Sequence, residues 1–226
     1  MSVTDSTRSD RTVHRHFRSA AIALFAFLAL CVTPVTPAAD EGSMTIKEGV
    51  LDELTIKTLK SPDGVGVIVR RFPTDNANLG TAEKGDNEKR LDAVNIMKRE
   101  APMVLADQIV KVLGLGGTYK YAREAEGESL PEDAIVVEGR FTLINPGSRA
   151  KRWAFFAGHS GIEVAGTVKD AHGNLLAEFT HRRGSGVGLA GGDYVKFLMD
   201  DTRDVGSDIA LFLKRWASGG DLSKDD

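Results

Sequence analysis

One short stretch places a serine between glycines, as nucleophilic hydrolases do. Gly158–Ile162 reads GHSGI, which matches most of the nucleophile elbow G-x-S-x-G, where a sharp strand-to-helix turn projects the serine hydroxyl over an oxyanion hole. Ile162 stands where the last glycine belongs, and the residues that follow alternate as a strand does. No catalytic residue is therefore assigned. A small periplasmic serine hydrolase that uses Ser160 with His159 or His181 is the alternative function.

A second stretch, GVGLAG at residues 186–191, spells the glycine pattern of dinucleotide-binding loops. In such proteins the glycines let the backbone approach a pyrophosphate inside a βαβ unit, whose second strand carries an acidic residue for the ribose. Only one helical segment follows residue 191, so that second strand has no place in the chain. We expect a tightly turned loop here, and no cofactor.

A third stretch, DDTRD at residues 200–204, matches the acidic motif that holds Mg²⁺ against a diphosphate. Enzymes with this motif need a large helical bundle and a second acidic cluster, and this sequence has neither. Asp200, Asp204 and Asp208 are instead expected on the solvated face of the last helix, paired with nearby basic residues.

Histidines offer little support for a metal site. After removal of residues 1–38 the remaining histidines are His159, His172 and His181. They are far apart in the sequence, and no H-x-H or H-x-x-x-H pair among them fixes two ligands locally. His172 lies in a predicted turn. We expect no metal site.

Three basic residues stand directly before three aromatic residues in SRAKRWAFFAGHSG, residues 148–161. Arginines beside aromatic rings can contact phosphates or stack on bases. If residues 1–38 are removed, the chain keeps 25 basic and 30 acidic residues, and an acidic domain argues against nucleic acid as a partner. Arg149, Arg152 and Trp153 are therefore predicted to form a contact surface for another protein or for a membrane surface.

The N-terminal residues 1–38 have the order of a secretory signal peptide. Four arginines precede the apolar run at residues 20–32, and proline and small residues follow at 33–39. The apolar run has 13 residues, whereas a helix needs about 20 to cross a bilayer. We therefore predict export to the periplasm, with cleavage near Ala38 or Ala39.

The only cysteine, Cys31, ends this apolar run, and residues 28–31 partly resemble a bacterial lipobox. Leu30 is bulkier than the small residue that a lipobox has before the cysteine. Lipidation at Cys31 would anchor the protein to the outer membrane, and otherwise membrane association would require an uncleaved N-terminus. After ordinary cleavage the chain has no cysteine, which excludes disulfides and thiolate metal sites.

The remaining residues predict alternating strands and helices. Residues 39–62 read as a tether and lead-in that contains at most one strand. Strands are predicted at 64–72 and 134–144, and a hairpin at 162–169 and 175–181. Helices are predicted at 91–112, where Pro102 should kink or divide the helix, and at 194–216.

This order of elements predicts an α+β fold in a single compact domain, residues 63–217. Its sheet should be mostly antiparallel, with four to five strands and two main helices packed on it. Ile135, Val137, Phe141 and Leu143 should face the helices, whereas Glu138, Arg140 and Thr142 should face water. Residues 218–226 are expected to be a flexible tail.

The motifs VVEGRFTLINPGSRAKRW and IEVAGTVKDAHGNLLAEF, the early strand VIVRRF and the closing helix together resemble an uncharacterised bacterial family of envelope proteins and lipoproteins, DUF4410. The resemblance spans Val65 to Trp216. It implies a small periplasmic α+β domain without assigned catalytic residues. The chain differs from the family pattern at residues 154–156, where glycines are expected.

Composition, motifs and resemblance together predict a non-enzymatic exported protein. It would be a binding or accessory module of a periplasmic or outer-membrane assembly, and its partner would be another envelope protein. The oligomeric state stays open.

Overall fold

A computed structural model describes residues 43–80, 88–127, 129–147, 160–184 and 193–223. All of these residues belong to the unit Ala39–Asp226. The predicted signal peptide at residues 1–38 lies outside them, and so does Cys31. No helix in the described ranges combines the length and the apolar character needed to span a bilayer.

The described strands form one mixed sheet, with the spatial order β1-β2-β7-β6-β5-β3-β4. β3 pairs in parallel with β4 and with β5, and every other pair is antiparallel. The prediction of an α+β fold with a mostly antiparallel sheet is confirmed. The strands are β1 (Met44–Lys47), β2 (Glu53–Ile56), β3 (Gly66–Val69), β4 (Ala122–Glu124), β5 (Ala134–Asn145), β6 (Gly161–Asp170) and β7 (Leu175–Arg183).

The sheet has seven strands, more than the four or five predicted. β1 and β2 come from residues 39–62, where at most one strand was expected, and β4 follows the first helix. These strands have only three or four residues each. An alternation of apolar and polar residues can be recognised only over a longer run. These short strands are therefore specified by pairing with neighbouring strands and not by local sequence.

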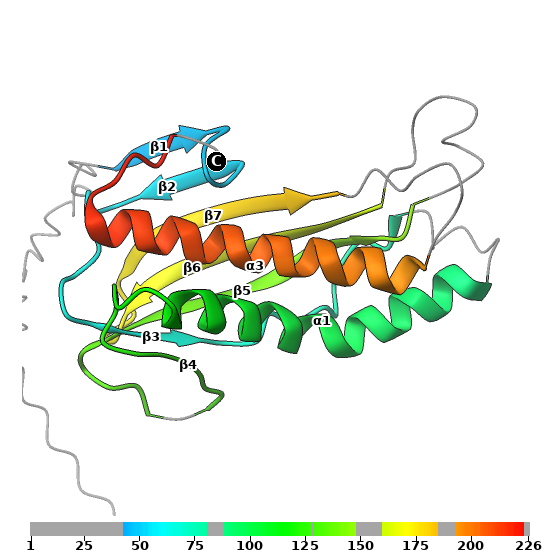
Figure 1. Ribbon diagram of the computed structural model, residues 1–226, viewed down its shortest axis with the longest axis horizontal. Helices are drawn as coiled ribbons and strands as arrows, with labels where there is room; N and C mark the ends of the chain where they lie inside the picture. Colours follow the sequence, from blue (N-terminus) through cyan, green and yellow to red (C-terminus); the bar gives the residue numbers. More distant parts are fainter. Residues whose placement is uncertain (1–42, 81–87, 128, 148–159, 185–192, 224–226) are drawn as a thin grey trace, which may run out of the picture. The chain divides into compact units, whose positions relative to one another are not determined.

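Two long helices, α1 (Glu88–Gly114) and α3 (Tyr194–Ser218), lie side by side on one face of the sheet (Figure 1). Their backbones approach closely at Gly206, where a Cβ would lie 3.0 Å from Cβ of Gln108 and 3.2 Å from the Leu105 carbonyl oxygen. Gln108 Nε2 also donates to Ser207 Oγ at 2.9 Å. The two helices therefore form one layer above the sheet.

The first helix continues through Pro102 as one helix. Of the predicted kink or division at Pro102, the division is therefore wrong. Proline has no N–H to donate to the carbonyl four residues earlier, that of Lys98. The buried Thr74 supplies a donor instead, because its Oγ1 donates to the Lys98 carbonyl at 3.0 Å. The proline is therefore accommodated by a residue from the segment before the helix.

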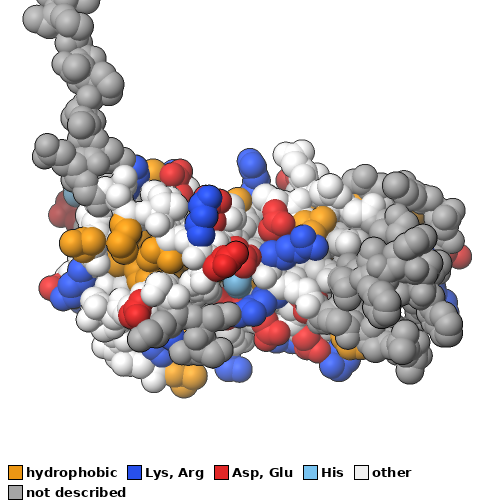
Figure 2. Space-filling model, turned by 90° about the horizontal axis from the view of Figure 1, so that it is seen from above, with side chains coloured by type: hydrophobic (Ala, Val, Ile, Leu, Met, Phe, Trp, Pro, Cys, Tyr) orange, Lys and Arg blue, Asp and Glu red, His pale blue; other side chains and the backbone are white. Residues whose placement is uncertain are grey.

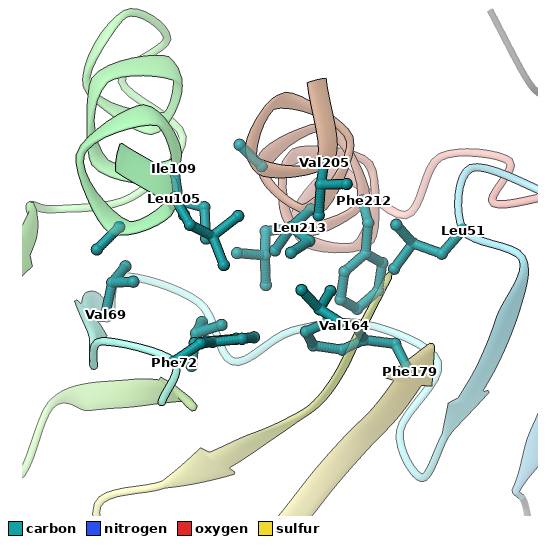
Figure 3. Packing of buried hydrophobic residues seen from close by; sticks show 14 of the residues in the cluster. Leu51, Val69, Phe72, Leu105, Ile109, Val164, Phe179, Val205, Phe212 and Leu213 are labelled. Atoms are coloured by element: carbon teal, nitrogen blue, oxygen red, sulfur yellow. The ribbon is translucent and has the colours of Figure 1, made fainter. Parts of the chain in front are cut away.

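The main core lies between the helices and the sheet. Figure 3 shows Leu105 and Ile109 of α1 and Val205, Phe212 and Leu213 of α3 directed towards side chains of the sheet layer. Along β5 the pairing with β6 shifts register between Phe141 and Leu143. Ile144 is consequently buried, whereas Leu143, predicted to face the core, is only half-buried.

The end of α3 and the residues after it contact the segments on either side of β2. Trp216 Nε1 donates to the Thr58 carbonyl at 2.9 Å, and its ring stacks on Phe212 with centroids 5.7 Å apart. Beyond the helix, Leu222 is buried, and its carbonyl accepts from Val50 N at 3.2 Å. Residues 219–223, expected to belong to a flexible tail, thus pack against the segment between β1 and β2.

Candidate functional site: the open face of the sheet

The face of the sheet opposite the helices carries a band of polar and charged side chains. On β5, Glu138, Arg140 and Thr142 point to this face, as predicted, because side chains of a strand alternate between its two sides. The band continues across β6, β7 and β2 with the same alternation. We call this surface the open face.

Strand pairing arranges these side chains in rows across the sheet. In one row Glu53 pairs with Thr180, Thr180 with Ala165, and Ala165 with Arg140. The adjacent row contains Thr55, Glu178, Thr167 and Glu138 in the same strand order. Each row ends in a charged residue on β5.

The middle of the open face is hollowed, with a volume of about 880 Å³. Arginine and glutamate side chains meet here with threonines and small residues. The residues that line the hollow include Glu53, Thr55, Arg70, Arg71, Glu138, Arg140, Ala165, Thr167, Glu178 and Thr180. The lining can form ion pairs and hydrogen bonds with a partner.

Some charges of the open face neutralise one another. Glu138 accepts from Arg70 Nη1 at 3.1 Å and from Lys169 Nζ at 2.7 Å. Arg140 and Glu178 are exposed, and neither has an ion-pair partner among the residues that the structure describes. These two side chains are available to an incoming partner.

A second polar cluster joins β7, α3 and the β1–β2 turn. His181, whose side chain is 4% exposed, places Nε2 2.8 Å from Asp208 Oδ2 and Nδ1 3.3 Å from Asp52 Oδ2. The second contact is an ion-pair distance and lacks hydrogen-bond geometry. Arg183 Nε donates to the same Asp208 oxygen at 2.7 Å.

The carboxyl of Asp208 is tuned by this cluster. Burial alone would raise its pKa, but hydrogen bonds with His181 and Arg183 outweigh burial and hold the pKa below its usual value. Asp208 was predicted to lie on a solvated helix face, and this is wrong because the helix turns that residue towards β7. Asp200, by contrast, is half-exposed and pairs with Lys196 and Arg203, as predicted.

The structure does not bring Ser160 together with His181. His181 pairs with Val164 on β6, and Ser160 lies four residues before Val164, a separation of about 13 Å along a strand. Ser160 is itself only 1% exposed. His159, the other proposed base, lies outside the described residues.

The predicted contact residues Arg149, Arg152 and Trp153 also lie outside the described residues, as does the glycine motif at 186–191. His172 occupies a turn, as predicted, with its N–H donating to Asp170 Oδ1 at 2.9 Å. Within the described part of the chain, no three His, Cys, Asp or Glu residues converge in a way that could hold a metal ion.

Seen from above, acidic and basic side chains are interspersed over the middle of the domain, whereas hydrophobic side chains gather towards one end (Figure 2). Met44 and Leu59 are among the exposed large hydrophobic residues, 40% and 74% exposed. Isolated exposed apolar residues are common on protein surfaces. The charged open face is the more specific feature.

In the residues that the structure describes, the fold is α+β, with two helices on one face of a seven-stranded sheet. A family model, "Domain of unknown function (DUF4410)", matches residues 67–191. The chain belongs to this family, as its motifs indicated.

Other comparisons give more distant likenesses. No curated protein sequence matches the chain. Among solved structures, the PelC dodecamer from Paraburkholderia phytofirmans is similar at 13% identity and a TM-score of 0.39, covering 67% of this chain and 93% of that one. A second PelC structure from that organism, with one substitution, has 14% identity and a TM-score of 0.34, covering 67% and 94%.

Sequence reasoning missed several residues of the open face. Glu53, Arg70, Arg71 and Glu178 join the hollow only because β2, β3 and β7 are placed beside β5 and β6. Alternation along each strand indicates which side chains share a face. The sequence contains no comparable signal for the order of the strands.

Proposed function

We propose that this protein is a non-enzymatic, exported bacterial envelope protein whose open face binds another component of a periplasmic or outer-membrane assembly. The observation that carries this proposal is the open face itself, a charged and hollowed sheet surface that no helix of the described residues covers. Arg140 and Glu178 supply exposed charges of both signs there. Such a surface favours a polar protein partner, because charged side chains give specificity and orient the encounter.

The sequence supports the same proposal. Residues 1–38 have the order of a signal peptide, and Arg149, Arg152 and Trp153 lie in the sequence between β5 and β6, the two longest neighbours on the open face. We expect these residues to extend the contact surface. Cell fractionation and the intact mass of the protein test the export proposal. A mass that corresponds to a chain beginning near Ala38 or Ala39, or to a chain with a lipid at Cys31, supports export. A chain of full length in the cytoplasm contradicts it.

Binding through the open face is tested by charge reversal. The variant Arg140→Glu changes an exposed residue of the hollow, whereas Arg99→Glu makes the same change on α1, where the Arg99 side chain is 71% exposed. After chemical crosslinking in cells, we expect a discrete complex that is lost in Arg140→Glu and kept in Arg99→Glu. Equal yields in both variants would contradict the proposal.

The serine hydrolase remains a testable alternative. A serine-directed activity probe should leave the purified protein unlabelled, because Ser160 is buried and His181 is engaged by Asp208. Labelling that disappears in Ser160→Ala would establish the hydrolase and overturn the non-enzymatic proposal.

A further inference from the structure

On β5 and on β6, charges of opposite sign lie on opposite sides of one line across the open face. Gly139, Gly166 and Phe179 are directly paired across β5, β6 and β7, and we call this line the glycine row. On β5, Glu138 and Arg140 lie on opposite sides of the glycine row. On β6, Thr167 and Lys169 lie on one side of the glycine row, and Ala165 and Glu163 lie on the other. Lys169 and Glu163 are each three residues from Gly166.

This pattern matters for two copies that stack face to face. Consider a two-fold axis that runs parallel to the glycine row, midway between the two sheets. Rotation about this axis reverses the strand direction of the second copy. A residue on one side of the glycine row therefore faces the residue of the second copy that lies on the other side of the row, on the same strand. The strands of the two copies then run antiparallel and nearly aligned, a common arrangement for packed sheets.

Under this operation opposite charges meet on two strands. Arg140 faces Glu138 of the second copy, and Lys169 faces Glu163 of the second copy. On β7 and β2 the glutamates Glu178 and Glu53 face the hydroxyls of Thr180 and Thr55, and Ala165 faces Thr167. None of the facing pairs named here consists of two like charges. Glu138 would meet Arg140 of the second copy while it also accepts from Arg70 and Lys169 of its own chain.

We propose that the open face binds a second copy of this chain, in an antiparallel two-fold arrangement along the glycine row. The proposal rests on the proposed function, because it names the partner of the same surface. The hollow leaves space between the sheets for the long arginine, lysine and glutamate side chains. Since the contact is polar, the association weakens as salt rises.

Charge-reversal variants test the arrangement. Each protein is purified in the form that accumulates in cells, and sedimentation velocity over a concentration series measures its dimerisation. Arg140→Glu places Glu opposite Glu138, and Glu138→Lys places Lys opposite Arg140, so each variant alone should dimerise about tenfold more weakly or worse. Mixed together, the two variants restore both opposite-charge contacts and should form a heterodimer. Arg99→Glu should dimerise as the wild type does.

Because Glu138 also holds Arg70 and Lys169 within one chain, thermal unfolding must show that Glu138→Lys is folded.

Lys169→Glu mixed with Glu163→Lys provides a second, independent test. A wild type that stays monomeric at its highest soluble concentration overturns the proposal, as does a dimer that no mixture restores. If the wild type is monomeric but Arg140→Glu still loses a crosslinked complex in cells, the partner is another protein and only the self-association proposal fails.

Discussion

Gly166 on β6 lies directly over the ring of Phe179 on β7, its cross-strand partner. A Cβ on Gly166 would lie 2.4 Å from Cζ of Phe179, closer than any van der Waals contact allows. The ring is buried and packs at 6.3 Å from Phe212 of α3. The backbone of β6 therefore serves as one wall of the pocket that holds this ring, directly beneath the open face.

Gly166→Ala should lower the free energy of unfolding by about 1–3 kcal/mol, because the new methyl group must displace a packed ring. Phe179→Leu should also be destabilising, since it leaves a partial cavity. The double variant should lose less stability than the sum of the two single-variant losses, because the smaller leucine makes room for the methyl group. Urea unfolding of the four proteins checks this, and strict additivity would contradict the contact.

Thr74→Val should cost about 1–2 kcal/mol, because it leaves the Lys98 carbonyl without its donor. In a Pro102→Ala background the alanine N–H can donate to the same carbonyl, so the threonine substitution should cost much less. A double-mutant cycle from chemical denaturation measures this difference. An equal cost in both backgrounds would show that Thr74 does not compensate for the proline.

Asp208→Asn should lower stability at neutral pH by roughly 1–3 kcal/mol, since the buried His181 loses a charged partner. The pKa of Asp208 is lowered in the folded state, so the stability that its carboxylate contributes is present above the unfolded value of 3.8 and is lost as pH falls through the folded pKa. The difference between wild type and variant should therefore shrink below about pH 3.8.

Asp204→Asn is the matched control, because Asp204 lies one turn earlier on α3 and is exposed. It should change stability by less than about 0.5 kcal/mol at any pH. A gap between wild type and Asp208→Asn that is independent of pH would contradict the assigned role of the carboxylate.

Burial raises the pKa of Tyr119 from 10.0 to about 12, despite its contact with Ser61. Its hydroxyl donates to the Leu213 carbonyl at 2.8 Å. Because the folded pKa is raised, the stability linked to the protonated phenol is present below pH 10 and is lost as pH rises towards about 12. Tyr119→Phe should remove this alkaline loss, and unfolding curves between pH 9 and pH 12 check it.

The long elements of this fold were predictable from the sequence because their local patterns are strong. The β6–β7 hairpin was predicted from two alternating strands and the turn at Gly173, which has φ of 86°. The last helix was predicted from apolar spacing, and Tyr194, Leu198 and Trp216 are all buried as expected. Local periodicity encodes which side of such an element is buried.

Features that depend on contacts between distant residues were not predictable. β1 and β2 form because Leu54 and Ile56 pair with β7, more than a hundred residues later. The continuity of α1 depends on Thr74, and the burial of Ile144 depends on a register shift between strands. The open face likewise becomes a surface only when β2, β7, β6 and β5 are placed side by side.

The central claim is that the open face is the contact surface of this protein, and in-cell photocrosslinking from single positions tests it most directly. A photoreactive residue at Thr167 would project from the hollow, and one at Asp107 would project from the exposed side of α1. We predict a discrete crosslinked product from Thr167 and none from Asp107. A product from Asp107 alone, or no product from either position, would contradict the claim.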